Sequence, residues 1–124
     1  MPATSPFDVR GLFSDFEAIG LEPTADPLAF PGYSDQLRTA AGGGESVTAG
    51  IGQIGPHKVA AAIFNFNFLG GSMGMRAGDA LEEAMFLAAR EHVPFIAITA
   101  TGGARMQEGM AALAQMPRTV AAAR

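Results

Sequence analysis

Residues 58–76, KVAAAIFNFNFLGGSMGMR, change their pattern halfway along the stretch. The first part, Lys58–Phe68, is rich in Val, Ile and Phe, and it ends in an alternation of phenylalanine with asparagine. Alternation with a period of two is typical of a strand, here with an aromatic face and an amide face. The glycine-rich segment Leu69–Met75 ends this strand, and apolar residues spaced by three and four then predict a helix over Arg76–Glu91. The stretch therefore predicts a strand, a glycine-rich turn and a helix in succession.

The same succession occurs a second time further along the chain, and another strand precedes the first. The short apolar run Phe95–Thr99 is typical of a strand that is buried on both faces. Thr101-Gly102-Gly103-Ala104 breaks this strand, and a second helix is predicted over Arg105–Met116, with Pro117 as its kink or its end. Upstream, Ser46–Ile54 alternates like a strand, and a turn joins it to the strand described above as an antiparallel hairpin. The order β-β-loop-α-β-loop-α predicts an α/β fold.

The N-terminal part of the chain follows neither pattern. Residues 1–31 carry five of the eight prolines and show little periodicity. We expect an extended leader over residues 1–25, with one short helical turn around Gly11–Ile19, and the folded domain over residues 26–124. Asp26-Pro27-Leu28 is typical of a helix start, and a short helix is predicted over Tyr33–Ala41.

Composition excludes several classes of function. The net charge of −4 argues against nucleic acid as a partner, because phosphate binding requires a basic surface. The chain contains no cysteine, and its two histidines lie far apart in the sequence, so we expect no metal held by this chain. No apolar run of about 18 residues and no signal-like N-terminus are present, so we expect no membrane span and a cytoplasmic protein.

Two Gly-Gly pairs lie where a predicted strand passes into a predicted helix. Glycine lets the backbone approach a ligand closely, and the first N–H groups of a helix have no partner within it. Such groups can stabilise an oxyanion, and the loss of one donor typically costs about 3–4 kcal/mol. The alternative is that these glycines only allow tight turns and close packing, and the residues alone leave both interpretations open. Neither pair has the spacing of a dinucleotide or nucleoside triphosphate motif.

Three strings occur in the order and spacing of a known family. They are Asp26-Pro27-Leu28-x-Phe30, Phe66-x-Phe68-Leu69-Gly70-Gly71-Ser72-Met73-Gly74, and Thr101-Gly102-Gly103-Ala104-Arg105-Met106-Gln107-Glu108-Gly109, which Gln115-Met116 extends. Over about residues 26–123 the chain resembles the carboxyltransferase β subunit of bacterial acetyl-coenzyme A carboxylase, in the crotonase-like superfamily. The resemblance implies a crotonase/ClpP-like spiral of ββα units. Residues 26–124 would be its N-terminal half, about half a domain.

The resemblance also implies a reaction. A carboxyl group passes from carboxybiotin, held on a separate biotin carboxyl carrier protein, to acetyl-coenzyme A or another short acyl-coenzyme A, and malonyl-coenzyme A is formed. Such a transferase supplies fatty-acid or polyketide biosynthesis. Two alternatives stay open. One is a component that decarboxylates a malonyl thioester, and the other is a non-catalytic assembly subunit of a carboxylase complex.

The family motifs assign roles to residues of this chain. Gly102 and Gly103 match the oxyanion-hole pair and would hold the thioester oxygen or the biotin oxygen. Arg105 and Glu108 are expected to brace the motif as a structural ion pair. The residues expected along the acyl-coenzyme A are Gly70, Gly71, Ser72, Met73, Gly74, Arg76 and Ala104. For Arg76, contact with a coenzyme A phosphate and simple solvation at a helix start are equally compatible with the sequence.

Two departures from the family pattern bear on assembly. The four-cysteine zinc ribbon of the family has no counterpart here, and the family's subunit is about twice as long. Half of the domain would leave the sheet around Phe64–Phe68 and the helix Arg105–Met116 partly uncovered, and such surfaces normally mark interfaces. We therefore expect a complementary carboxyltransferase chain or C-terminal half as partner, in a hetero-oligomer. The chain would be either a natural split subunit or a truncated one.

Overall fold

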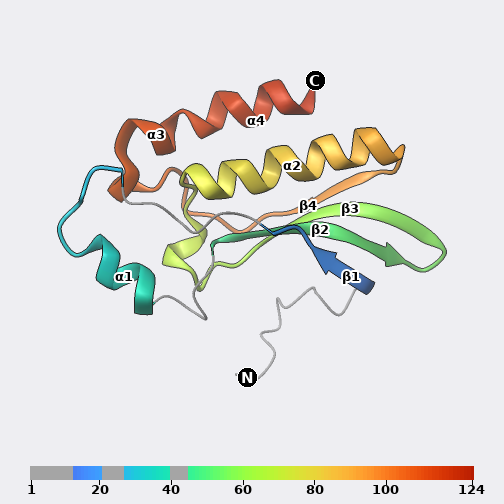
Figure 1. Ribbon diagram of the computed structural model, residues 1–124, viewed down its shortest axis with the longest axis horizontal. Coiled ribbons are helices and arrows are strands. Elements are labelled where there is room, and N and C mark those ends of the chain that lie inside the picture. Colours follow the sequence, from blue (N-terminus) through green and yellow to red (C-terminus); the bar gives the residue numbers. More distant parts are fainter. Residues whose placement is uncertain (1–12, 21–26, 40–44) are drawn as a thin grey trace.

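The computed structural model describes residues 13–20, 27–39 and 45–124. In this part the chain forms a four-stranded sheet with helices stacked over one face (Figure 1). The long helix α2 (Met75–Glu91) packs on the two central strands, and α4 (Gln115–Ala123) packs on the outer side of α2. The layers are therefore sheet, helix and helix, with both glycine-rich junctions at the same end of the sheet.

The strands run in the order β1 (Ser14–Ala18), β2 (Val47–Ile54), β3 (His57–Phe64) and β4 (Phe95–Ile98). The β2–β3 hairpin is antiparallel, as predicted, and its register ends with Ile54 opposite His57. β4 pairs with β3 in parallel, and α2 forms the crossover between these two strands. A parallel pair requires such a crossover, so the β-α-β order predicted from the sequence is confirmed.

Small residues set the distance between α2 and the sheet. The buried face of this helix is mostly alanine, and Ala77, Ala80 and Ala84 are fully buried against the sheet residues of the same core cluster. A second cluster lies on residues that point to the other side of β3, among them Val59 and Ile63. Alternate residues of β3 therefore serve two cores, and its near-continuous apolar sequence reflects burial on both faces.

The helical turn that was expected over residues 11–19 is wrong, because the chain forms the strand β1 there. The spacing of Phe13 and Phe16 arises from a break in the strand register between Ser14 and Glu17, not from a helix. This irregularity brings both phenylalanines to the same cluster, with their ring centroids 5.5 Å apart. The rest of the leader and Asp26 lie outside the described residues, and the domain boundary at residue 26 stays a prediction.

The strand predicted as far as Phe68 ends at Phe64. The N–H of Asn65 still donates to the carbonyl oxygen of Ser46, at 2.7 Å, but the side chain of Asn65 then accepts the N–H of Asn67 at 3.0 Å. Such a side-chain bond to the backbone two residues on is typical of a turn. Phe66 is consequently exposed, whereas Phe68 is buried, so the alternation of Phe and Asn was wrongly interpreted as a continued strand.

The C-terminal helix is also divided differently from the prediction. A single helix was expected over residues 105–116, but the chain forms a 3-10 turn η3 (Met106–Glu108), then α3 (Gly109–Leu113), then α4. Pro117 is the third residue of α4, which continues to Ala123, so Pro117 does not end the helix. The helix is interrupted at Ala114, in the turn before Pro117, as the alternative of a kink predicted. β4 was expected to be buried on both faces, but its residues are half-buried or exposed, since within the described residues it pairs with β3 alone.

The two other short helices lie near the junctions. α1 spans Tyr33–Thr39, which agrees with the predicted helix over its described length, and η2 spans Leu69–Gly71 directly after the turn that ends β3. In Figure 1, α1 lies near the end of the sheet from which both junctions leave.

Candidate functional site

The two glycine-rich junctions lie side by side. Gly102 donates its N–H to the carbonyl oxygen of Gly70 at 2.9 Å. Met73 donates its N–H to the carbonyl oxygen of Gly103 at 2.7 Å, and its own carbonyl oxygen accepts the N–H of Arg105 at 2.8 Å. These last two bonds form a short parallel bridge between Met73 and Ala104. The segments that follow β3 and β4 are thus joined into one rigid unit at the ends of the strands.

Close packing alone accounts for two glycines of the first junction. Gly71 has a φ of +66°, and a Cβ at this position would collide with the carbonyl oxygen of Ala100. A Cβ at Gly74 would collide with the carboxylate of Glu108. Both residues therefore must be glycine for the junctions to meet, whether or not a ligand binds. Their expected contact with acyl-coenzyme A stays a prediction.

The N–H groups of Gly102 and Gly103 are engaged within the chain. That of Gly102 is used in the junction bond described above, and that of Gly103 donates to the side-chain Oγ1 of Thr101 at 3.0 Å. Gly103 has a φ of +104°, and no other part of the chain lies within 4 Å of the place where its Cβ would be. Gly103 therefore faces open space, and the only partner of its N–H in the described residues is an exposed hydroxyl.

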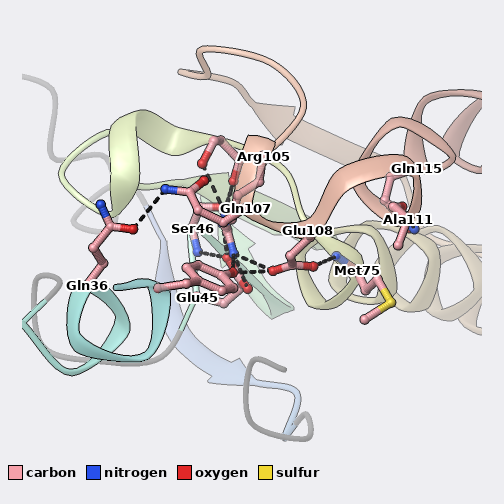
Figure 2. Close-up of polar contacts among 11 residues, drawn as sticks. Gln36, Glu45, Ser46, Met75, Arg105, Gln107, Glu108, Ala111 and Gln115 are labelled. Atoms are coloured by element: carbon pink, nitrogen blue, oxygen red, sulfur yellow. Dashed lines mark hydrogen bonds and ion pairs between the residues drawn. The ribbon is translucent and has the colours of Figure 1, made fainter. Parts of the chain in front are cut away.

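Arg105 lies beneath these junctions, with 1% of its surface exposed. Its guanidinium carbon is 5.3 Å from the ring centroid of Phe68, and its Nε donates to Ser72 Oγ at 3.1 Å. Nη1 donates to Glu45 at 2.9 Å and to Glu108 at 3.2 Å. The remaining acceptors are Tyr33 Oη, Ser46 Oγ and the carbonyl oxygen of Ser72. Figure 2 shows this cluster, in which a single guanidinium joins segments from four parts of the chain.

The cluster holds one positive and two negative charges, because Arg105 faces both Glu45 and Glu108. Two neutral hydrogen-bond donors stabilise the excess negative charge. The hydroxyl of Tyr33 donates to one oxygen of Glu108, and the N–H of Met75 donates to the other at 2.8 Å. Met75 is the first residue of α2, where the helix dipole favours a negative charge. The N-terminus of α2 is thus already occupied by a carboxylate of the protein itself.

Burial and charge shift two pKa values in this cluster. Burial, together with the hydrogen bond to Glu108, raises the pKa of the Tyr33 hydroxyl far above its usual value. Burial on its own would lower the pKa of Arg105, but the bonds and charge of Glu45 outweigh it and raise the pKa. Both shifts favour the protonated forms of Tyr33 and Arg105, so the cluster serves to fix geometry rather than to transfer protons.

Arg76 lies at the start of α2, where its Nη1 forms an ion pair with Asp79 at 2.9 Å. Asp79 also pairs with Arg118 of α4 at 2.7 Å, and Arg118 binds Glu82 at 2.8 Å. This network joins α2 to α4. It gives Arg76 a structural partner, and contact between Arg76 and a phosphate stays a prediction.

A family model described as the carboxyl transferase domain matches residues 21–123. The chain belongs to this family. Among curated relatives, the acetyl-coenzyme A carboxylase carboxyl transferase subunit beta of Rhodopseudomonas palustris (strain BisB5) is 47% identical over 107 residues. This match covers 82% of the chain but only 33% of the relative, so the chain spans about a third of the length of such a subunit. The family resemblance inferred from the motifs is confirmed.

Two solved structures, a transcarboxylase and a malonate decarboxylase, share the fold. Transcarboxylase 12S, solved with hydrolysed methylmalonyl-coenzyme A bound, is 27% identical in sequence, with a TM-score of 0.77. The match covers 92% of this chain and 22% of the transcarboxylase chain. A Pseudomonas malonate decarboxylase hetero-tetramer in complex with malonate is 28% identical with a TM-score of 0.65, covering 92% and 43%. The α/β, crotonase-like fold class is therefore confirmed, as part of a domain.

Three residues of the cluster around Arg105 were not predicted from the sequence. Tyr33, Glu45 and Ser46 lie about 60 to 72 positions from Arg105, and no local pattern links them to it. The one available signal was that Tyr33 is the only tyrosine of the chain, three residues after the first family string. Arg105 and Glu108 were predicted to pair, and they do form an ion pair.

The described part of this carboxyl transferase domain contains neither a cluster of metal ligands nor a membrane-spanning helix. Among residues 13–20, 27–39 and 45–124, no group of three or more His, Cys, Asp or Glu side chains is placed to hold a metal ion. Within the same residues, none of the helices has both the length and the apolar character needed to span a bilayer.

Proposed function

We propose that this chain is a component of a biotin-dependent acyl-coenzyme A carboxyltransferase. The acceptor would be acetyl-coenzyme A or another short acyl-coenzyme A, and the product malonyl-coenzyme A or its homologue. The observation that carries the proposal is the open position of Gly103 at the joined junctions, in a chain 47% identical to a carboxyl transferase β subunit. Supply of fatty-acid or polyketide biosynthesis is the role this activity would have.

The residues present fit such a reaction. Carboxybiotin, on a separate carrier protein, would supply the carboxyl group and the base for the α-proton. The N–H of Gly103 would hold the thioester oxygen, on which negative charge develops when the α-proton leaves. One preorganised donor of this kind is worth about 10²–10³ in rate. The Arg105 cluster would keep this donor in place, because the buried side chains of Arg105 and Glu108 connect both junctions.

A partner chain forms part of the proposal. The transcarboxylase is described as a hexamer and the malonate decarboxylase as a hetero-tetramer. On this chain, Met106, Met110 and Leu113 lie on η3 and α3 with 71%, 77% and 53% of their surface exposed. Neighbouring exposed apolar side chains are typical of a surface that meets further protein. We propose a complementary carboxyltransferase chain and a biotin carboxyl carrier protein as partners. The cytoplasmic location stays a prediction.

Decarboxylation of a malonyl thioester is the second candidate, favoured by the 28% identity to a malonate decarboxylase. Both reactions stabilise the same enolate, so the dependence on biotin separates them. The complex in which the chain purifies is incubated with malonyl-coenzyme A, with and without biocytin. A transferase consumes malonyl-coenzyme A only when biocytin is present, and we expect this result. Equal consumption without biocytin would favour the decarboxylase, and no consumption under either condition would favour the assembly subunit.

A further inference from the structure

The hydroxyl of Thr101 accepts the N–H of Gly103, the group that would hold the thioester oxygen in the proposed reaction. Its Oγ1 is 3.0 Å from the backbone nitrogen of Gly103, within the 2.7–3.1 Å at which an oxyanion donor acts. Thr101 is exposed and Gly103 is half-buried, and the side of Gly103 where a Cβ would stand is open. The chain therefore supplies an acceptor of its own to the N–H that the proposed reaction needs.

The N–H of Gly102 cannot be released in the same way. Its acceptor is the backbone carbonyl oxygen of Gly70, which is held in the joined junctions next to the Met73–Ala104 bridge. Freeing this N–H would break one of the three backbone hydrogen bonds that join the two junctions. Freeing the N–H of Gly103 requires only a rotation of the Thr101 side chain, which is exposed and can bind water instead. The two predicted donors are therefore unequal, and Gly103 is the available one.

We propose that Thr101 is a positioning residue whose hydroxyl occupies the oxyanion position in the free protein and is displaced by the thioester oxygen. The inference rests on the proposed function, because it assumes an acyl-coenzyme A at Gly103. When no substrate is bound, the hydroxyl satisfies the N–H and holds the turn at its positive φ. When substrate binds, the thioester oxygen takes its place and the hydroxyl turns to water. No covalent bond changes in this exchange.

The proposed exchange predicts that loss of the Thr101 hydroxyl strengthens the binding of acetyl-coenzyme A. A hydroxyl that only stabilises the loop predicts the opposite. In a Thr101→Val variant the N–H of Gly103 is bonded only to water before substrate arrives, so binding no longer has to break an internal hydrogen bond. Acetyl-coenzyme A should then bind about twofold to tenfold more tightly, which is the net value of one neutral hydrogen bond. If the hydroxyl only stabilised the conformation of the loop, its removal would make the site less ordered and would weaken the binding of acetyl-coenzyme A.

The test measures the Kd of acetyl-coenzyme A by titration calorimetry on the complex in which the chain purifies. Thr101→Val should tighten binding, whereas Thr101→Ser, which keeps the hydroxyl, should match the wild type. Thr99→Val is the matched control, because Thr99 is also exposed and lies two residues earlier in the same loop. Its Kd should equal that of the wild type.

Hydrogen exchange supplies a second readout that needs no substrate. The amide of Gly103 should exchange faster in Thr101→Val than in the wild type or in Thr101→Ser, and acetyl-coenzyme A should protect it in all three. An unchanged or weakened Kd for Thr101→Val, with the wild type binding normally, would overturn this inference and leave the proposed function standing. Failure of the wild type to bind acetyl-coenzyme A would overturn both.

Discussion

Replacement of Arg105 by methionine tests the role of the buried cluster. The methionine keeps the length and the apolar stem of the side chain but removes the charge and all donors. Glu45 and Glu108 then remain in a nearly dry site without their cation, since their side chains are 7% and 1% exposed in the ion pairs. Leaving a buried charge without its partner costs about 3–5 kcal/mol.

The expected loss is large compared with the stability of such a domain. We predict that Arg105→Met lowers the free energy of unfolding by about 4 kcal/mol, which changes the unfolding equilibrium nearly a thousandfold. Small domains are typically stable by only 5–15 kcal/mol. The measurement is urea unfolding followed by circular dichroism. Arg90→Met is the control, because Arg90 is exposed in the last turn of α2, and its replacement should cost less than about 0.5 kcal/mol.

A second substitution shows whether the loss comes from the unpaired carboxylates. In the double variant Glu45→Gln with Arg105→Met only Glu108 remains charged, and it keeps the hydroxyl of Tyr33 and the N–H of Met75 as donors. The loss in the free energy of unfolding should therefore be smaller in the double variant than the sum of the losses in the two single variants, by about 0.5–3 kcal/mol. Additive losses, or a loss below about 1 kcal/mol for Arg105→Met, would refute the electrostatic account of this cluster.

Two further predictions concern other bonds of the fold. Tyr33→Phe removes one donor from the buried carboxylate of Glu108 and should lower the free energy of unfolding by about 1–3 kcal/mol, and an unchanged urea midpoint would contradict this. The hydrogen bond from Arg118 lowers the pKa of Glu82 below its usual 4.5. A lowered pKa contributes stability that is complete above pH 4.5 and is lost as the pH falls below that value. Glu82→Gln should therefore destabilise the chain at neutral pH, with a difference from wild type that shrinks in acid. A constant difference across urea titrations at several pH values would show that no proton is linked to this pair.

Much of the central fold could be predicted because its signals are local. The β2–β3 hairpin and α2 follow from periods of two and of three to four residues, and their observed bounds differ from the predicted ones by a few residues at most, apart from the end of β3. The same periods predicted both glycine pairs between a strand and the following helix, where the structure has them. These features depend on neighbours in the sequence, so the sequence is sufficient to predict them.

The errors arose where a local event changed the period. A register break in β1 gave Phe13 and Phe16 a helical spacing, and the side-chain bond of Asn65 turned an alternating run into a turn. The Arg105 cluster was only half predicted for a different reason. Glu108 lies three positions from Arg105, whereas Glu45 reaches it across 60 positions and only through the folded sheet. Long-range pairs of this kind leave no trace in a single sequence.

The two predicted donors illustrate what the structure adds. The sequence treats Gly102 and Gly103 as an equivalent pair, because both follow the same strand. The structure separates them, since one N–H is fixed in the backbone of the junction and the other has an exposed hydroxyl as partner. The proposed oxyanion site therefore has one available N–H donor, that of Gly103, instead of two equivalent donors.

The most direct test of the central claim compares two glycine-to-alanine variants in the purified complex. Gly103 and Gly55 both have a positive φ, +104° and +57°, and open space at the Cβ position, so both substitutions strain the backbone without a collision. Only Gly103 lies at the proposed site. Alanine keeps the N–H but rarely adopts a φ near +104°, so Gly103→Ala should turn the N–H away from the reacting oxygen. We predict that kcat/KM for biocytin-dependent consumption of malonyl-coenzyme A falls about 10²–10³-fold in Gly103→Ala and stays within about twofold of wild type in Gly55→Ala. Equal activities of the two variants would contradict the claim that the N–H of Gly103 stabilises the reacting oxygen.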